Sequence, residues 1–339
     1  MIEPSKIKTI AVLTKCNIAH HLTLRLRVIL MQPFLEAHGY TLEVIQLDKV
    51  KSCRLSQLEK AGQYDLVWLH RVIFTGRELY YVKKMSQKIV FDFDDPVCFS
   101  SSSFLNFSLK KSIRFRQTVK ASAAILAASP GLVALASKLN NKTYYAPLCA
   151  EPENYCLKTN DRKAGENLKL LWLGGRSTFK YLESIAPQLE SIGQHCKNVE
   201  LIVVGHNQIS LQNLPVTNIA WSQEQEQIQL ESCHVGLVPS VDDRWTRAKA
   251  TLKPLQYMAS GLPLIASPVG ILHQFVDNGN NGFCAKSNNQ YLEAVEFFLS
   301  NEIDRRNMGA NGIAYVKENH SAEKLANSIK NVFDDVLAL

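Results

Sequence analysis

The sequence predicts an α/β protein made of two domains. At 339 residues it has room for about two domains of roughly 150 residues each. Apolar runs of strand length alternate with helical patterns along both halves, which favours parallel sheets covered by helices on both faces. The polar segment 151–167 (EPENYCLKTNDRKAGEN) interrupts this alternation and is typical of a linker. We therefore expect domains at 1–158 and 166–310.

The expected strands are read from the apolar runs in chain order. In the first half they are KTIAVLT (8–14), LEVIQL (42–47), DLVWLH (65–70), KIVFDFD (88–94), AILAAS (124–129) and TYYAPL (143–148). In the second half they are LKLLWLGG (168–175), VELIVVG (199–205), HVGLVPS (234–240) and LPLIAS (262–267). The tail SAEKLANSIKNVFDDVLAL (321–339) has the spacing of an amphipathic helix.

One stretch, KATLKPLQYMASGLPLIASPVG (249–270), combines core residues with regularly spaced polar ones. Its apolar spacing predicts a helix over 252–260, capped by Thr251 and ended by Gly261. A strand and a tight turn at Pro268 and Gly270 follow. The polar residues fall on one stripe of the helix or just before it: Lys249, Lys253, Gln256 and Ser260.

Composition limits the partners and the compartment. The net charge of +7 suits phosphates or an anionic membrane surface and is too small to indicate nucleic acid. No apolar run approaches the ~18 residues that span a bilayer, and we see no signal peptide. The eight cysteines form no C-x-x-C pair, so we expect reduced, structural thiols. The expected location is the cytoplasm, and peripheral contact with the inner membrane face is the alternative that the basic charge allows.

Ligands of open α/β sheets bind beyond the carboxyl ends of the strands. In the second half, cations and a glycine-containing turn follow such ends and could surround a diphosphate, although solvated surface lysines are the alternative. The candidate donor-binding residues are Gly175, Arg176, Lys180, His206, Lys249, Lys253, Gln256, Val269 and Gly270. Asp242 and Asp243 follow the strand GLVPS and are candidate catalytic carboxylates.

At these residues the sequence resembles the family-4-like retaining glycosyltransferases of the GT-B architecture. The matching pieces are LWLGGRSTFKYL, HVGLVPSVDDRWTRAKATLKPLQYMASGLPLIASPVG and VDNGNNGF, with weaker matches in YDLVWLHR, VFDFDD and ILAASPGLVALA. The resemblance implies two Rossmann-like domains facing across a cleft, with the final helix (320–339) crossing back onto the first domain. It further implies a nucleotide-sugar donor in the second domain, whose diphosphate Arg176 and Lys180 hold, and a hydroxyl acceptor in the first.

The sequence departs from the family pattern at two positions. The broad family has glutamates where this chain has Ala248 and Gln256. Gln256 can still bond a ribose hydroxyl, whereas the carboxylate at 248 is missing unless Asp242 or Asp243 replaces it. Two hypotheses follow: an enzyme that transfers a sugar to a glycan, lipid-linked saccharide, small molecule or protein with retention, or a non-catalytic module that binds sugar nucleotides or a partner.

Four further patterns bear on function. FDFDD (91–95) imitates a D-x-D metal motif, but two Rossmann-like halves fit a metal-independent enzyme without a cofactor, so Asp94 is instead a candidate catalytic residue, as is His70. His20 and His21 follow a strand and could line the acceptor side. The run 110–120 (KKSIRFRQTVK) carries five cations and indicates either a solvated helix face or a membrane patch. LGGRST lacks the G-x-G-x-x-G order of dinucleotide oxidoreductases.

Overall fold

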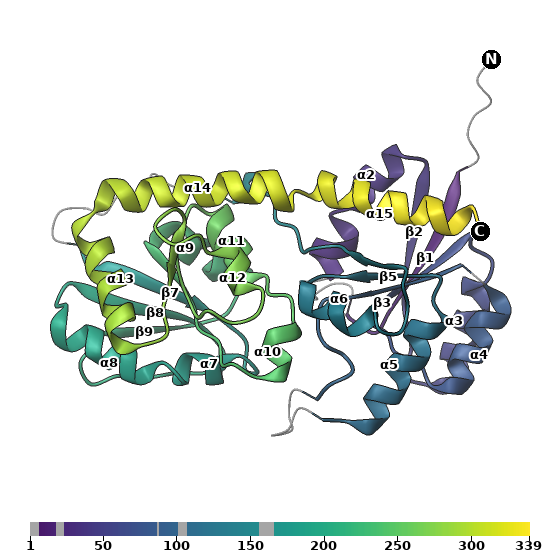
Figure 1. The fold of residues 1–339 in the computed structure, drawn as a ribbon, viewed down its shortest axis with the longest axis horizontal. Helices are drawn as coiled ribbons and strands as arrows, with labels where there is room; N and C mark the ends of the chain where they lie inside the picture. The colour runs from purple at the N-terminus through teal and green to yellow at the C-terminus, as the bar shows by residue number, and fades with distance from the viewer. Residues whose placement is uncertain (1–6, 18–23, 87, 101–106, 156–165) are drawn as a thin grey trace, which may run out of the picture. The chain divides into compact units, whose positions relative to one another are not determined.

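The computed structural model describes residues 7–17, 24–86, 88–100, 107–155 and 166–339. The chain divides into two compact units (Figure 1). Unit 1 consists of Met1–Cys149, Ala248–Ala250 and Ala322–Leu339, and unit 2 of Ala150–Arg247 and Thr251–Ser321. Each unit contains one six-stranded sheet, and the pairs of neighbouring strands in both sheets are parallel. The α/β fold class predicted from the alternation of apolar runs and helical patterns is confirmed.

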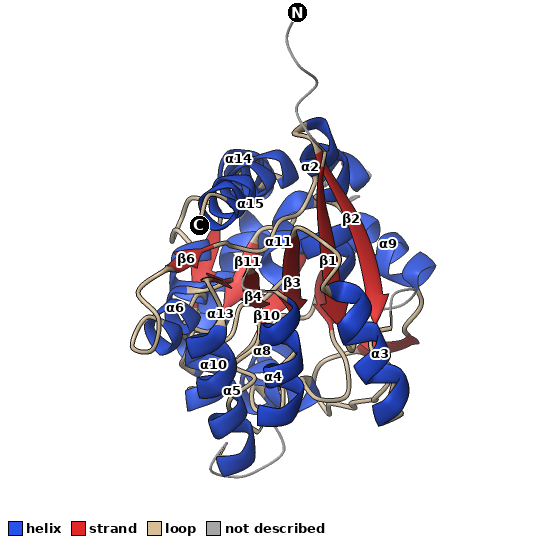
Figure 2. Cartoon of the chain, turned by 90° about the vertical axis from the view of Figure 1, so that its right-hand side faces the viewer, coloured by secondary structure: helices blue, strands red, loops and turns tan. Residues whose placement is uncertain are grey.

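The sheet of unit 1 has the strand order β2-β1-β3-β4-β5-β6 (Figure 2). Its strands are β1 (Lys8–Thr14), β2 (Tyr40–Gln46), β3 (Leu66–His70), β4 (Ile89–Phe93), β5 (Ala124–Ala127) and β6 (Thr143–Tyr145). The order reverses between β1 and β3, so the binding crevice of such a fold lies at their carboxyl ends. In the register Thr14 is opposite His70, and His70 is opposite Asp92.

Helices cover both faces of this sheet because successive residues of each buried strand point to opposite sides. Ile10 and Val12 pack in one apolar cluster with the C-terminal helix α15 (Ala322–Leu337), while Ala11 and Leu13 belong to the other. The remaining helices are η1 (Arg25–Ile29), α2 (Gln32–Ala37), α3 (Lys51–Ala61), α4 (Gly76–Met85), α5 (Leu109–Ala121) and α6 (Pro130–Ala136). The last helix therefore packs on the first sheet, as the resemblance implied.

The sheet of unit 2 has the order β12-β11-β10-β7-β8-β9. Its strands are β7 (Leu168–Leu173), β8 (Val199–Gly205), β9 (Val216–Ala220), β10 (Val235–Val238), β11 (Leu264–Ala266) and β12 (Gly282–Cys284). Here the order reverses between β7 and β10, which locates the crevice at the carboxyl ends of those two strands. β7 and β10 are apolar runs buried on both faces, as expected of central parallel strands.

The helices of unit 2 follow its strands in turn. They are η2 (Pro152–Asn154), α7 (Phe179–Glu183), α8 (Ala186–His195), α9 (Gln223–Ser232), α10 (Arg244–Ala248, whose last residue belongs to unit 1), α11 (Lys253–Ala259), α12 (Leu272–Phe275), α13 (Asn288–Ser300) and α14 (Glu302–His320). The helix expected over 252–260 is α11. The prediction that Thr251 caps it is wrong, because the N-cap is Leu252 and no side chain bonds to the helix start.

Two other expectations concern cysteines and membranes. The seven cysteines within the described ranges are free thiols, and Cys156 lies outside those ranges. Within the same part of the chain, no helix combines the length and the apolar character that crossing a bilayer requires.

Candidate functional site

The crevice of unit 2 is marked by Lys253, the first residue of α11. Its Nζ lies 4.6 Å from the centre of the Trp172 ring on β7 and donates to Thr178 Oγ1 at 3.3 Å. Trp172 is 1% exposed, so its ring is a fixed apolar base beneath a half-buried ammonium group. An ammonium held over an aromatic face with part of its hydration removed is well placed to attract an anion.

One turn later on α11, Gln256 contacts a carboxylate from another helix. Gln256 is 4% exposed, and its Nε2 donates to Glu226 Oε1 on α9 at 2.9 Å. The other oxygen, Glu226 Oε2, accepts from Trp221 Nε1 at 2.8 Å. The Trp221 ring is 47% exposed and its centre lies 6.4 Å from that of His206, the residue after β8. Gln256, Glu226, Trp221 and His206 thus form a connected polar and aromatic series that begins one turn after Lys253.

The loop after β7 brings backbone and cations to the same end of the sheet. Gly174 lies against the Trp172 ring so closely that a Cβ there would come within 2.1 Å of it. Gly175, by contrast, faces open space, and Arg176 and Lys180 are exposed. These exposed positions are consistent with an anion-binding edge.

The predicted carboxylates Asp242 and Asp243 have partners within their own segment. Asp242 is 59% exposed and forms an ion pair with Arg247, with Nε 2.5 Å from Oδ1. Asp243 Oδ1 accepts from the backbone N–H of Thr246 at 2.8 Å, while its own N–H donates to Thr246 Oγ1 at 3.0 Å. Both aspartates therefore bond to residues of α10. These contacts give Asp242 and Asp243 a structural role, which makes them weaker candidates for the catalytic carboxylate that the family has at position 248.

The turn after β11 is tightly built around Gly270. Its φ is +56°, and a Cβ at this position would come within 2.6 Å of the Thr246 carbonyl oxygen. Both conditions exclude larger residues without a shift of the backbone. The adjacent Val269 is 9% exposed, and its N–H donates to Ser267 O at 2.8 Å. The turn predicted at Pro268 and Gly270 is therefore present, and its Gly270 packs closely against the backbone of α10.

Lys249 belongs to a different unit from the other predicted donor residues. The segment Ala248–Ala250 belongs to unit 1, where the Ala250 N–H donates to Asp94 O at 2.9 Å and Ser129 Oγ donates to the Ala248 carbonyl. Ala248 is 6% exposed and packs in an apolar cluster of unit 1. The position of the missing family carboxylate is thus a buried apolar one, and Lys249 acts electrostatically on Asp95.

The crevice of unit 1 contains two aspartates that share one arginine. Arg71 follows β3 and has a φ of +58°, an uncommon value for a residue with a side chain. Its guanidinium contacts Asp94, with Nε 3.1 Å from Oδ1, and also forms an ion pair with Asp95. The Asp94 side chain is 5% exposed and that of Asp95 is 26% exposed. Residues with a side chain that are held in this left-handed backbone conformation cluster at active and ligand-binding sites.

The two carboxyl groups differ in their pKa. Burial by itself raises the pKa of Asp94, but the charges of Arg71, His70 and Arg27 and a backbone hydrogen bond together hold that pKa below its usual value. Burial and the Asp94 charge raise the pKa of Asp95, against the opposing charges of Arg71 and Lys249. The ionised form of Asp94 is therefore favoured while the pKa of its neighbour Asp95 is raised, and such a divergence is a pattern found in acid–base sites.

His70 and Asp92 are buried beneath this pair. His70 is 0% exposed, and its Nδ1 lies 3.3 Å from Thr14 Oγ1. His70 is one of the predicted catalytic residues, and because its ring is fully buried it can act on an acceptor only through its neighbours. Asp92 forms a buried ion pair with Arg27, with Nε 2.7 Å from Oδ1, so it holds the fold together. His20 and His21 lie outside the described residues.

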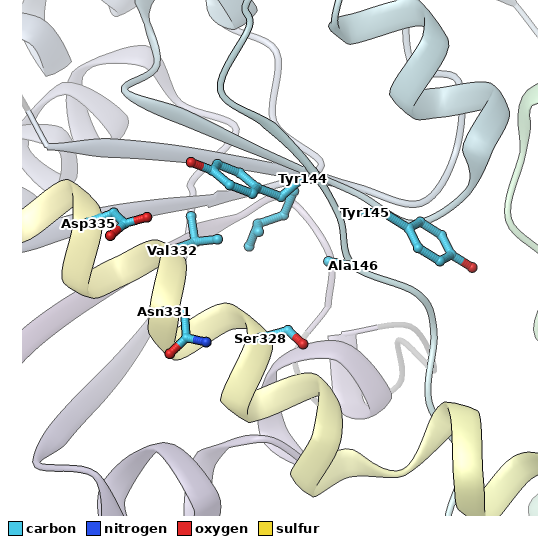
Figure 3. Close-up of a pocket in the computed structure, with 8 residues that line it drawn as sticks. Tyr144, Tyr145, Ala146, Ser328, Asn331, Val332 and Asp335 are labelled. Atoms are coloured by element: carbon cyan, nitrogen blue, oxygen red, sulfur yellow. The ribbon is translucent and has the colours of Figure 1, made fainter.

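The remaining candidates are a metal site, the basic run and a surface pocket. Across the described parts of the chain, no three His, Cys, Asp or Glu side chains are grouped as a metal site requires. The basic run 110–120 lies on α5, which buries Phe115 and exposes Lys110, Lys111, Arg116 and Lys120. A surface pocket of about 270 Å³ lies between the end of the first sheet and α15; Tyr144 points towards the helix and Tyr145 away from it (Figure 3). It contains none of the predicted site residues.

Sequence reasoning missed Glu226, Trp221, Trp172, Thr178 and Arg71 as members of these sites. Arg71 directly follows a predicted strand, so its position at a strand end was a usable signal. Trp172 looks like ordinary core, and Glu226 is one of several similar residues on a polar helix. Their roles depend on which elements the fold brings together.

With this geometry in place, comparisons with known proteins identify the fold. Residues 169–301 match the family described as glycosyl transferases group 1. No curated protein sequence matches the chain at a significant level. Among solved structures, sucrose-phosphate synthase from Thermosynechococcus elongatus has a TM-score of 0.75 at 15% identity, covering 98% of this chain and 99% of that one.

Two further structures are similar at low identity. HepE from Anabaena, solved in complex with UDP-glucose, has a TM-score of 0.72 at 12% identity, covering 96% of this chain and 99% of that one. WaaG, a glycosyltransferase involved in lipopolysaccharide biosynthesis, has a TM-score of 0.65 at 14% identity, covering 96% and 99%. The chain therefore has the GT-B fold with two Rossmann-like domains, and the match to the group 1 glycosyl transferases lies within its second domain.

Proposed function

We propose that the protein transfers a sugar from a nucleotide diphosphate sugar to a hydroxyl acceptor. The observation that carries the proposal is the Lys253 ammonium, held over Trp172 and beside Thr178 at the crevice of a group 1 glycosyltransferase domain. In this proposal the diphosphate binds near Lys253 with help from Arg176 and Lys180. Charge-assisted hydrogen bonds then stabilise the negative charge that develops on the leaving diphosphate.

The acceptor is assigned to the crevice of unit 1. Asp95 is the more exposed of the two aspartates and has the raised pKa, so it is suited to exchange a proton with an acceptor hydroxyl. Asp94 and Arg71 hold it in place, and His70 supports them from below. The resemblance to retaining enzymes leads us to propose retention of the anomeric configuration. We also propose that no metal is needed, because cations and backbone groups at the donor crevice can serve the diphosphate.

A donor panel tests this proposal. The protein is incubated with UDP-, GDP-, ADP- and dTDP-sugars, and donor hydrolysis and transfer to sugar acceptors are followed by chromatography. UDP-glucose is the first choice because HepE was solved with it. We expect at least one donor to be hydrolysed slowly without an acceptor, with unchanged rates in EDTA. A product with inverted configuration by NMR would refute retention, and activity that requires Mn²⁺ would refute metal independence.

A second function is favoured by one observation, the burial of Ala248 in an apolar cluster of unit 1. A chain without a carboxylate at that position could be a non-catalytic module that binds sugar nucleotides or a partner. The same panel separates the two functions: nucleotide binding by calorimetry without hydrolysis or transfer of any donor would favour the module.

A further inference from the structure

The surface pocket of unit 1 lies to one side of the crevice of that unit. Its volume is about 270 Å³, and it lies between the edge of the sheet at β6 and the helix α15. β6 is three strand positions from β3, where the crevice lies, so about 14 Å of sheet separates them at ~4.8 Å per strand. A ligand in this pocket therefore occupies a site of its own.

The base of the pocket is apolar. It is formed by Leu126 on β5, Ala146 after β6 and Val332 on α15, which are buried together in one cluster of the core. The half-buried Tyr144 packs on the same cluster and points towards α15, whereas Tyr145 points away from it (Figure 3). The pocket thus combines an aliphatic base with one aromatic side chain.

The rim on α15 is polar. Ser328, Asn331 and Asp335 are exposed and follow one another at i, i+3 and i+7, so they lie on one stripe of the helix. Ser328 Oγ donates to the Lys324 carbonyl at 3.0 Å and can still accept a bond. Among the described residues, the side chains of Asn331, Asp335 and Tyr144 have no hydrogen-bond partner. The rim therefore offers donors and acceptors that the chain itself does not use.

An apolar base with a few polar groups around it is the usual pattern of a small-molecule site. A sugar ring has the matching character, because C–H groups cover its faces and hydroxyl groups surround its edge. A hydroxyl can donate to the Asp335 carboxylate and accept from the Asn331 amide. The volume is close to the lower end of the range for such sites, roughly 300 Å³, which suits a single ring.

Charge limits the kind of sugar. Asp335 places a negative charge at the rim, and Lys330 on the same helix is already paired with Asp334 at 2.6 Å. An anionic ligand would meet the Asp335 carboxylate without a free cation from Lys330 to offset it. The pocket therefore favours an uncharged sugar over a uronic acid.

We propose that this pocket binds one uncharged sugar ring, with Asp335 and Asn331 bonding its hydroxyls and Tyr144 and Val332 covering a C–H face. The site is distinct from the donor and acceptor positions of the proposed function, and the inference does not depend on sugar transfer. A sugar held here is a non-reacting one, such as another unit of a larger glycan.

Methyl NMR on the full chain tests the inference, because three methyl-bearing residues form the base of the pocket. The protein is titrated with glucose, galactose and mannose, each paired with its uronate, and with cyclohexanol as a ring of mainly apolar character. At least one neutral sugar should shift the methyl signals of Leu126, Ala146 and Val332. Val72, which follows Arg71 at the crevice, should not move. The matching uronate should bind about threefold or more weakly, since like charges repel.

Two variants on the exposed stripe of α15 complete the test. Asp335→Ala should weaken binding of the sugar roughly tenfold, because it removes a charge-assisted hydrogen bond. Glu323→Ala is the matched control: it removes the same charge from an exposed position of the same helix, outside the pocket, and should leave the affinity unchanged. Ser328→Met places a longer apolar side chain in the pocket and should abolish binding. Thermal unfolding checks that each variant is folded.

Several results would overturn the inference. They are equal affinity for a sugar and its uronate, binding of cyclohexanol as tight as that of the sugar, and an unchanged affinity in Asp335→Ala. Absence of any shift at the pocket methyls with millimolar sugar overturns it as well. None of these results bears on donor hydrolysis, so the proposed function stands or falls by its own donor panel.

Discussion

Replacing Lys253 with methionine removes one charge and keeps most of the side chain. The ammonium lies 4.6 Å from the Trp172 ring centre and 3.3 Å from Thr178 Oγ1, so the methionine can still cover the ring. A charge-assisted hydrogen bond contributes about 1.5 to 3 kcal/mol, which corresponds to a loss of roughly 10- to 150-fold in nucleoside diphosphate affinity. The unliganded protein loses only a cation–π contact of about 0.5 to 2 kcal/mol and should remain folded.

The assay measures Kd for the nucleoside diphosphate and for the nucleoside alone, with thermal unfolding as a check on the fold. The affinity for the diphosphate should fall, while affinity for the nucleoside should stay within about threefold, because the lost interaction is with phosphate. Lys197→Met, an exposed lysine in the same unit, is the control. If Lys253→Met binds the diphosphate as the wild type does, α11 does not line the donor site and the placement of the donor in this crevice is wrong.

Three further changes have expected outcomes. Asp92→Asn breaks the buried ion pair with Arg27 and should lower unfolding stability by about 3 to 5 kcal/mol in urea; a change below ~1 kcal/mol would contradict that role. Gly270→Ala should lower stability by more than ~1 kcal/mol, since its φ is +56° and the new Cβ meets Thr246 O; an unchanged urea midpoint would refute this. Burial raises the pKa of Asp334, but hydrogen bonds from Lys330, Lys8 and Tyr40 lower it by more, so the folded-state pKa lies below the unfolded value. The stability that Asp334 contributes to the fold is therefore present above about pH 4 and is lost as the pH falls below it. Asp334→Asn should flatten the acid limb of a pH–stability curve.

The parts of the site that could be predicted are those governed by local spacing. Lys253 and Gln256 are three residues apart in a helical pattern, so the sequence alone places them on one stripe of α11. The strand pattern likewise placed Arg176, His206 and Gly270 after strands of one sheet. Periodicity fixes which residues share a face and which follow a strand, because both depend on neighbours in the chain.

The parts that could not be predicted depend on contacts between distant segments. Glu226 is one of three glutamates among four glutamines in SQEQEQIQLES, and only the return of α9 towards α11 decides which one meets Gln256. Lys249 has the helical spacing of the donor stripe, yet it precedes α11. The hydrogen bond from Ala250 to Asp94 instead holds its segment in unit 1. The spacing of residues along the chain cannot predict that hydrogen bond, because it joins segments that are far apart in the sequence.

The two departures from the family pattern have a common physical explanation in this structure. Ala248 is 6% exposed among apolar side chains, and a carboxylate added there would lose hydration at a cost of several kcal/mol unless a cation came with it. Gln256 is 4% exposed beside Glu226, and a second carboxylate at 256 would place two negative charges within hydrogen-bonding distance. Alanine and glutamine are therefore the residues that these surroundings favour. The negative charge is supplied from neighbouring elements of the same units, by Asp94 and Asp95 in unit 1 and by Glu226 in unit 2. For this reason the missing glutamates alone do not argue against an active enzyme, and donor hydrolysis has to decide.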